Sequence, residues 1–517
     1  MQPVVWEPPV ALSPQEAAIV RRIHRAKLFV FLRAHRHDLF TAPFQQELAA
    51  TYRDSPLGRP PVPPAQLALA VLLQAYTGVS DDEVIEATTM DRRWQLVLAC
   101  LDAEQPPFSK GTLVGFRQRL IAAELDRRLI ERTLECYTAE HGVSSSRPLR
   151  AALDSSPLWG AGRVEDTYNL LGHAVRKALS VLARQQGRGL AAVAAEAGAE
   201  RVVTSSLKAA LDRNWDEPAA RETALAAVLG MVAQVEAWLG SQAHTPAVDA
   251  ALAVAAQVRE QDVAHPGAGG AALRQGVAAE RRISVEDGAM RHGRKSRSVR
   301  VDGYKRHALL DLDLDLVRAV GLTPANRPEA EATEAILADL APQAVVLSEL
   351  HIDRGYLSST LVRDRADDLA VYCKAWPVRN GSRFTKLAFT LDWEAGTLTC
   401  PNRQTLPFRP GATVHFPTET CAACPLRERC TASARGRSVS IHPDERLLAE
   451  FRQRQATPAG RAKLRERVAV EHGLAHLGAW QGNRARYLGE RKNLFDLRRV
   501  AVVHNLHVLA RSLAPAA

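Results

Sequence analysis

Two aspartates follow short apolar segments of the kind that form buried strands. Asp154 follows the run at 149–153, Asp353 follows the run at 344–352, and small or turn-forming residues come after each. The carboxyl ends of neighbouring strands meet at one edge of an α/β sheet, where such folds place their sites. Clustered carboxylates need a cation, so the pair predicts a Mg²⁺ or Mn²⁺ site. Ordinary turn chemistry is the alternative for either aspartate alone.

A third acid is expected on a helix near the C-terminus. The segment LRERVAVEHGLAHLGAW (464–480) places Arg467 and Glu471 four residues apart, on one helix face with apolar neighbours. A surface ion pair would have the same spacing. Glu490 and Asp302 are rival third ligands, and we rank Asp302 lower because it lies in a basic, turn-like DGYKRH segment.

Four of the seven cysteines lie within 31 residues, with the spacing C-x20-C-x2-C-x5-C: Cys400, Cys421, Cys424 and Cys430. A CxxC pair with two flanking cysteines predicts a tetrahedral structural zinc site. Free thiols and disulfides are the alternatives, and His415 or His442 could replace Cys400 as a ligand. Cys100, Cys136 and Cys373 are expected to be small buried hydrophobic residues.

The elements that must position these residues fall into several blocks. The first 145 residues read as short helices, including 14–54, 65–78 and 113–142, with a capping box formed by Ser80 and Glu83. Strands at 149–153, 344–353 and 369–376, together with a hairpin within 297–326, predict an α/β domain with a mixed sheet. Alanine-rich helices at 165–262 and a linker at 265–272 interrupt this domain.

Composition and charge restrict the class of protein. The 517 residues are 46% hydrophobic and 24% charged, which excludes a disordered tail, a collagen-like fibre and a disulfide mini-protein. We expect no signal peptide and no membrane span. The net charge of +10 is local, because 281–307 holds nine Lys/Arg against three acids and 452–499 holds twelve against four. Two arginine-rich runs favour contact with phosphate, although solvated surfaces are the alternative.

These motifs together resemble the DDE transposases of bacterial insertion sequences, in the insertion-sequence-eleven-eighty-two-like group. The similar segments are LDSSPLWGAGRVEDTYNLL (153–171), MRHGRKSRSVRVDGYKRHALLD (290–311), LTPANRPEA (322–330), ELHIDRGYL (349–357), RERVAVEHGLAHLG (465–478) and the closing segment 483–511. Residues 46–130 resemble the helical N-terminal domain of the family. The signature helix of the family often has a Tyr and a Lys where this chain has Leu464 and Gly478.

The resemblance implies a ribonuclease-H-like α/β catalytic core with Asp154, Asp353 and Glu471 as the catalytic acids. They would hold two Mg²⁺ (or Mn²⁺) ions for cleavage of transposon ends and strand transfer. The alternatives are an inactive, transposase-derived DNA-binding protein and a ribonuclease-H-like nuclease without strand transfer. The expected domains are a helical DNA-binding domain (1–145), the core (146–164, 281–395 and 446–517), a helical insertion with its linker (165–280) and a cysteine-rich insertion (396–445).

The resemblance also implies partners and DNA contacts. Double-stranded DNA is the expected partner, pairing of two transposon ends predicts a homodimer, and the expected location is the cytoplasm, at the nucleoid. Trp480 and Tyr487 could stack on an unpaired base, or could pack in the core. The cations expected along the DNA path are Arg294, Lys295, Arg297, Lys305, Arg467, Arg484, Arg486, Arg491 and Lys492.

Overall fold

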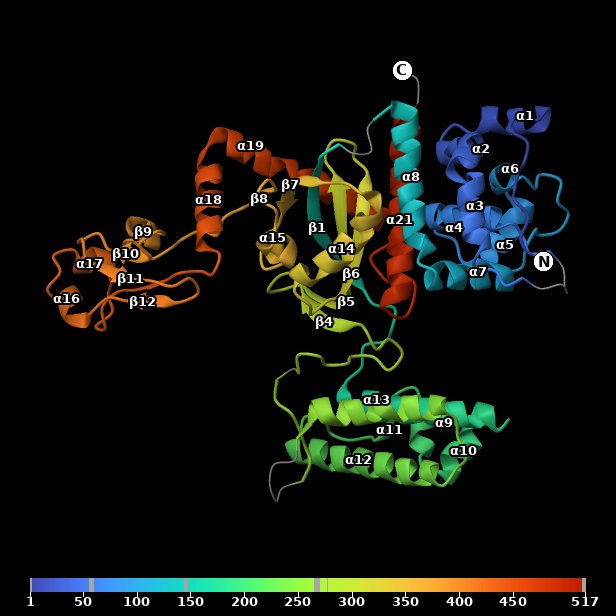
Figure 1. Ribbon diagram of the computed structural model, residues 1–517. Coiled ribbons are helices and arrows are strands. Elements are labelled where there is room, and N and C mark those ends of the chain that lie inside the picture. Colours follow the sequence, from blue (N-terminus) through green and yellow to red (C-terminus); the bar gives the residue numbers. More distant parts are fainter. Residues whose placement is uncertain (1, 55–59, 144–146, 265–269, 277, 514–517) are drawn as a thin grey trace.

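The computed structural model describes residues 2–54, 60–143, 147–264, 270–276 and 278–513. In Figure 1 a mixed sheet lies at the centre, with N-terminal helices on one side, a small β unit on the opposite side and a separate helical bundle below. The linker predicted at 265–272 falls mostly outside the described residues. Its end, β3 (Ala272–Leu273), pairs with β2 (Val263–Ala264).

The central sheet has six strands: β1 (Leu149–Trp159), β4 (Arg291–Arg294), β5 (Arg300–Asp311), β6 (Val317–Pro324), β7 (Leu347–Ile352) and β8 (Ala370–Cys373). The order across the sheet is β6–β5–β1–β7–β8, and β4 pairs with the first residues of β5. β5 is antiparallel to β1, β4 and β6, whereas β1, β7 and β8 run parallel. The mixed sheet agrees with the α/β class expected from the sequence.

β1 extends beyond the strand expected at 149–153, so Asp154 lies inside the strand and not at its end. The two neighbours of β1 differ in length. Parallel pairing with β7 stops at the Leu153–Ile352 pair, whereas antiparallel pairing with β5 continues as far as Trp159. The long β5 therefore keeps the chain extended after Asp154. Asp154 still comes directly after Leu153, the last residue of β1 that pairs with β7.

Helices cover both faces of the sheet: α14 (Ala332–Leu340), α15 (Thr360–Arg363), α18 (Glu445–Ala456), α19 (Pro458–Glu466), α20 (Val468–Gln481) and α21 (Glu490–Ser512). Ala151 and Leu153 pack on the face covered by α14, α15 and α18, whereas Ala152 packs on the face of α20 and α21. Side chains alternate between the faces of a strand, so Asp154 lies on the same face as Ala152. That face is the one that α20 covers.

The N-terminal helices are α1 (Pro14–Arg22), α2 (Lys27–Leu39), α3 (Ala42–Ala49), α4 (Pro64–Thr77), α5 (Asp81–Met90), α6 (Arg92–Leu98), α7 (Lys110–Ala122) and α8 (Leu125–His141). The capping box of Ser80 and Glu83 is confirmed. Two long helices expected from the sequence are divided. Ile23 and Thr41 are extended, which separates α1, α2 and α3, and Glu124 has a left-handed backbone between α7 and α8.

The N-terminal helices share one hydrophobic core with the α20–α21 face of the sheet. α4 is buried along most of its length, and α21 packs against both α4 and α8. A buried ionic network joins the same parts: Arg498 of α21 donates to Asp126 of α8 at 3.1 Å and to Asp339 of α14 at 2.7 Å. The position of the N-terminal helices relative to the sheet is therefore fixed by the core itself.

The helical block between β1 and β4 has a hydrophobic core of its own. Its elements are α9 (Thr167–Gln185), α10 (Leu190–Glu196), η1 (Glu200–Val203), α11 (Leu207–Ala210), α12 (Pro218–Gly240) and α13 (Pro246–Asp262). Among the described residues α12 alone has the length and composition of a membrane span, with a mean hydropathy of 1.4 over 18 residues. Core helices of soluble proteins meet the same criteria. Val228, Val232 and Val235 of α12 pack in the core of the block.

The small β unit seen at one end of the molecule in Figure 1 lies between β8 and α18. Its elements are η5 (Lys386–Ala388), β9 (Thr390–Asp392), β10 (Thr397–Thr399), β11 (Thr405–Pro407), β12 (Thr413–His415), α16 (Thr418–Ala422), α17 (Arg427–Cys430) and β13 (Ser438–Ser440). β9, β10 and β11 form one antiparallel sheet, and β12 pairs with β13. The core of the unit is small: seven buried residues, among them Phe389, Leu398 and Phe416.

Candidate active site in a carboxylate-lined cleft

A cleft of about 730 Å³ lies beside β1, between the sheet and the first turns of α20. Four acids line it, and they come from four separate segments: Asp154 (β1), Glu329 (η2, Glu329–Glu331), Asp353 (after β7) and Glu471 (α20). Five cations line the same cleft: Arg294, Lys295, Lys305, Arg306 and Arg467. The sheet and one helix thus bring acids that are up to 317 residues apart in the sequence into one concave surface.

Asp154 and Asp353 occupy equivalent positions on neighbouring parallel strands. Each follows directly on a member of the last parallel pair, Leu153 with Ile352. Each carboxylate accepts a hydrogen bond from the next backbone N–H, at 2.8 Å from Ser155 and at 2.6 Å from Arg354. These bonds hold both side chains beside the backbone at the point where the two strands part.

Glu471 reaches the cleft from the first turn of α20, and Arg467 lies just before that helix. One guanidinium nitrogen of Arg467 bonds the carboxylate of Asp154, and the other donates to Glu471 Oε1 at 2.8 Å. The expected i,i+4 pair is therefore present, and it also bridges two of the acids. The rival acids lie elsewhere: Glu490 is not among the described residues that line the cleft, and Asp302 pairs with His292 at 2.6 Å and lines a different hollow.

Glu329 was not expected at this site. It follows β6 in the short 3₁₀ helix η2, which packs against η4 (Arg354–Tyr356), the turn after Asp353. Ser155 Oγ donates to Glu329 Oε1 at 2.6 Å. In the sequence Glu329 is one acid among three in PEAEATE, and no strand precedes it directly, so the spacing gave no signal for its role.

The electrostatics of the cleft favour a bound cation. Burial raises the pKa of the Asp154 carboxyl, and the negative charges of Asp353 and Glu329 raise it further, whereas Arg467 and the Ser155 N–H lower it. Of the five cations that line the cleft, Arg467 is the one that forms ion pairs with these acids among the described residues, so part of their negative charge has no cation in contact. Carboxylate oxygens are the ligands that Mg²⁺ and Mn²⁺ prefer, so the donor set fits such an ion.

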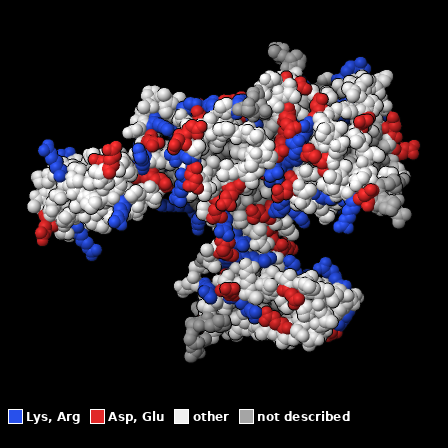
Figure 2. Space-filling view, viewed as in Figure 1, with Lys and Arg blue, Asp and Glu red and all other residues white. Residues whose placement is uncertain are grey.

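The nine cations expected along the DNA path divide into two groups. Within the described parts of the chain, the side chains of Lys295, Arg297 and Lys492 are exposed and make no hydrogen bond or ion pair. The other six make bonds within the protein, although Arg294 and Arg484 are also exposed: Arg294 to Arg297 O, Lys305 to Arg327 O, Arg467 to Asp154 and Glu471, Arg484 to Gly160 O and Ala161 O, Arg486 to Val79 O, and Arg491 to Asp126. Figure 2 shows positive and negative side chains interspersed over the face in view, as expected where many cations already have partners.

The two aromatic residues considered for base stacking pack against the protein. The ring of Trp480 stacks on His507 with centroids 5.0 Å apart, and Tyr487 lies between Phe495 and the guanidinium groups of Arg117 and Arg499. Both belong to the rim of the core shared by the sheet and the N-terminal helices. Core packing therefore accounts for their positions.

The cysteine cluster lies in the small β unit. Cys400, Cys421, Cys424 and Cys430 are free thiols that line one cavity of about 30 Å³. Backbone N–H groups point at two of the sulfurs, from Gln404 to Cys400 Sγ at 3.3 Å and from Arg437 to Cys421 Sγ at 3.5 Å. The alternative ligands His415 and His442 are not among the described residues that line this cavity.

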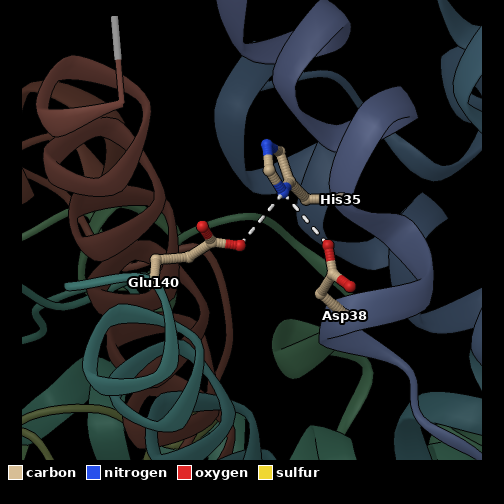
Figure 3. A group of neighbouring side chains, drawn as sticks. All are labelled: His35, Asp38 and Glu140. Atoms are coloured by element: carbon tan, nitrogen blue, oxygen red, sulfur yellow. Dashed lines mark hydrogen bonds and ion pairs between the residues drawn. The ribbon is translucent and has the colours of Figure 1, made fainter. Parts of the chain in front are cut away.

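Two other groups of potential ligands lie close together among the described residues, and the cysteines form no group of this kind. In each group the ligand atoms lie within 4.8 Å of one another: His35, Asp38 and Glu140 (Figure 3), and Glu349, His351 and Glu466. In the first, His35 of α2 contacts Asp38 at 3.1 Å and Glu140 of α8 at 4.0 Å. In the second, Lys463 and Arg150 already pair with the carboxylates, so the group ties α19 to β7.

Comparison with known proteins gives two matches, each to part of the chain. Residues 24–119 match a family model described as a transposase domain (DUF772), and residues 399–510 match one described as a transposase DDE domain. The second range includes Glu471 and the four clustered cysteines, and it leaves out Asp154 and Asp353. No curated protein and no solved structure matches the chain. Together the two matches support a DDE transposase.

Proposed function

We propose that the chain is a DDE transposase of the insertion-sequence-eleven-eighty-two-like group of bacteria, which cleaves transposon ends and joins them to target DNA. The observation that carries the proposal is the convergence of Asp154, Asp353 and Glu471 on one cleft lined with Arg and Lys. The strand order β6–β5–β1–β7–β8, antiparallel on one side of β1 and parallel on the other, supports a ribonuclease-H-like core.

In this proposal Asp154, Asp353 and Glu471 hold two divalent cations by their carboxylates. Such a pair of ions supplies activation of a water or a DNA 3′-hydroxyl and stabilisation of the leaving 3′-oxygen. Arg467 orients the carboxylates of Asp154 and Glu471 toward one another. Arg294 and Lys295, which are exposed and line the cleft, attract the phosphates of the DNA.

The same proposal assigns partners to the other parts of the chain. The N-terminal helices bind double-stranded DNA, and their fixed attachment to the sheet supports a constant distance between bound DNA and the cleft. Pairing of two transposon ends requires two copies of the chain, so the active form is a homodimer on DNA. Its place of action is the cytoplasm, at the nucleoid.

The test uses the full-length protein and a plasmid that carries its coding sequence with the native flanking DNA. Wild-type protein with Mg²⁺ is expected to nick or cut at the element ends and to form joined products, and EDTA is expected to stop both reactions. Asp154→Asn, Asp353→Asn and Glu471→Gln are each expected to lower cleavage by at least about 100-fold, because each removes a charged ligand. A gel-shift assay is expected to show DNA binding unchanged within about two-fold.

Glu490→Gln is the matched control, because Glu490 is an acid at a helix start that lies outside the described lining of the cleft. It is expected to cleave as wild type. Retained cleavage by Asp154→Asn or Asp353→Asn would reject the site. Cleavage without joining would indicate the nuclease, and binding without cleavage by the wild-type protein would indicate an inactive, transposase-derived DNA-binding protein.

We also propose a structural zinc ion bound by Cys400, Cys421, Cys424 and Cys430. Four thiols around one cavity are a donor set that suits Zn²⁺, and the N–H groups aimed at Cys400 and Cys421 stabilise the thiolate form. Because the hydrophobic core of this unit is small, a bound zinc ion would contribute much of its folding stability. Binding would draw the four sulfur atoms closer together than they are in this structure.

Elemental analysis of the purified protein is expected to find about one zinc per chain. The double variant Cys421→Ser/Cys424→Ser is expected to lose the metal and to make the β9–β13 unit sensitive to protease. Cys100→Ser, outside the cluster, is the control and is expected to keep the metal. Wild-type protein without zinc would reject this site and would leave the transposase proposal untouched.

A further inference from the structure

The carboxylate of Glu329 is held between two residues that adjoin the proposed metal ligands. Ser155, next to Asp154 in β1, donates its hydroxyl to Glu329 Oε1 at 2.6 Å. The other oxygen lies against Gly355, two residues after Asp353, where an added Cβ would lie 2.0 Å from Glu329 Oε2. Both contacts direct the carboxylate to the place where Asp154 and Asp353 meet.

The absence of a cationic partner distinguishes Glu329 from its neighbour Glu331. Within the described parts of the chain, no Lys, Arg or His nitrogen forms an ion pair with Glu329, whereas its neighbour Glu331 in the same η2 pairs with Arg327 at 3.8 Å. The hydrogen bond that Glu329 accepts from Ser155 comes from a neutral hydroxyl and occupies one of the two carboxylate oxygens. Glu329 is a half-buried carboxylate without a cation of its own, in a cleft with three other acids, and a cation bound in that cleft would compensate its charge.

The glycine at 355 is explained by the same contact. The three atoms nearest to an added Cβ at Gly355 all belong to the Glu329 side chain, and the nearest two are its carboxylate oxygen and carbon. The end of a flexible side chain can move aside, so alanine at this position would displace the carboxylate of Glu329 and leave the backbone in place. The chain thus gives Glu329 room at a position where most residues would push it out of the cleft.

We propose that Glu329 is a fourth carboxylate ligand of the divalent-metal site, in addition to Asp154, Asp353 and Glu471. The inference rests on the proposed function, because it assigns Glu329 to the same ions. Ser155 and Gly355 are positioning residues that act through Glu329: one fixes Oε1, and the other leaves space for Oε2.

The first experiment measures Mn²⁺ binding to the full-length protein without DNA, by electron paramagnetic resonance of the free ion. Glu329→Gln keeps the shape of the side chain and the contact with Ser155 but removes the charge. It is expected to weaken Mn²⁺ binding by about ten-fold or more, or to remove one of two bound ions. Glu331→Gln, two residues away in η2, is the matched control and is expected to bind Mn²⁺ as wild type.

The second experiment uses Gly355→Ala, which displaces the carboxylate without changing its charge. It is expected to weaken Mn²⁺ binding in the same direction as Glu329→Gln, and to have no further effect when it is combined with Glu329→Ala. Cleavage of the plasmid by both single variants is expected to need a higher Mg²⁺ concentration and to recover partly when Mg²⁺ is raised. Thermal unfolding of each variant checks that the fold is kept.

The outcomes separate this inference from the proposed function. Wild-type Mn²⁺ binding by Glu329→Gln, with binding lost in Asp154→Asn, would overturn the role of Glu329 and leave the DDE site standing. Unchanged Mn²⁺ binding in Asp154→Asn and Asp353→Asn as well would overturn both. A loss of binding in Glu331→Gln equal to that in Glu329→Gln would show a general charge effect and would also overturn the assignment.

Discussion

The hairpin of β4 and β5 gives the sharpest quantitative prediction about DNA binding. Its tip carries Arg294, Lys295 and Arg297, all exposed, and the first two line the cleft. The perturbation is the triple variant Arg294→Ala/Lys295→Ala/Arg297→Ala. If each side chain neutralises one phosphate, the slope of log K against log salt should fall in magnitude by about 0.9 for each residue, or about 2.7 in total. Between 50 and 200 mM salt, the wild type should then lose about 40-fold more affinity than the variant does.

The assay is fluorescence anisotropy of a labelled duplex from the element end, titrated at several NaCl concentrations in EDTA. The matched control removes three arginines that pair with acids and do not line the cleft: Arg188, Arg259 and Arg511. It changes the net charge by the same amount, so a slope close to that of the wild type is expected. A lower slope for the hairpin variant alone would place phosphates at the hairpin.

The result that would refute this reasoning is an unchanged slope in the hairpin variant. Weaker binding with the same slope would show that the hairpin affects DNA binding without contacting phosphate. Equal slope changes in the hairpin and control variants would show that net charge, and not the position of the hairpin, sets the salt dependence.

Three further predictions concern the framework around the cleft. Arg498→Met leaves Asp126 and Asp339 buried with less compensation, so the free energy of unfolding in urea should fall by about 3–5 kcal/mol. Adding Asp339→Asn should restore part of this loss, and a loss below about 1 kcal/mol would contradict the network. Burial lowers the pKa of His307 to about 3, below its unfolded value, so the neutral form stabilises the fold above pH ~6.5. As the pH falls from 6.5 toward 3, stability should drop by about 1.4 kcal/mol per pH unit through this residue, and His307→Gln should remove that part of the slope in urea unfolding. Replacement of 168–261 by a short Gly-Ser linker should keep Mn²⁺ binding. The two ends of the block are close enough for a short linker, because Thr167 and Asp262 are joined by a 2.8 Å hydrogen bond. Loss of Mn²⁺ binding by a folded deletion variant would show that the block supports the cleft.

Local sequence patterns predict the elements of this fold better than their ends. The alternation in β5 and the apolar run of β7 both predict strands. A strand buried on one face needs an apolar residue at every second position, and a strand buried on both faces needs a continuous apolar run. The end of β1 depends instead on its neighbours: β5 continues the pairing to Trp159 after β7 has stopped at Leu153. The break between α7 and α8 occurs at Glu124, which has a left-handed backbone. No glycine or proline stands at this position to signal the break in the sequence.

The candidate site shows the same limit. Asp154 and Asp353 can be predicted to meet because each follows a strand that the sequence reveals. Glu329 cannot, because it follows a loop and reaches the cleft only through the packing of η2 against η4. The roles of the arginines could not be predicted for a different reason. Arg467 and Arg491 lie in the same basic stretch of sequence, yet Arg491 pairs with the buried Asp126, whereas Arg467 bridges Asp154 and Glu471 of the cleft. A run of basic residues in the sequence shows how many cations are present, but not which acids they pair with.

The separate hydrophobic cores indicate which parts of the molecule can move relative to the cleft. Helices α4 and α8 share one core with α20 and α21, and Arg498 links α8, α21 and α14 by buried charges, so DNA held by the N-terminal helices would lie in a fixed register with Glu471. The block of α9–α13 has its own core and leaves the sheet just after β1. Glu471 is carried by α20, which belongs to the shared core, whereas the small β unit precedes α18 and α19 on the other side of the sheet. If the N-terminal helices bind DNA as proposed, that binding is coupled rigidly to the acids through the shared core, and a large change of shape on binding DNA would fall in the helical block or in the small β unit.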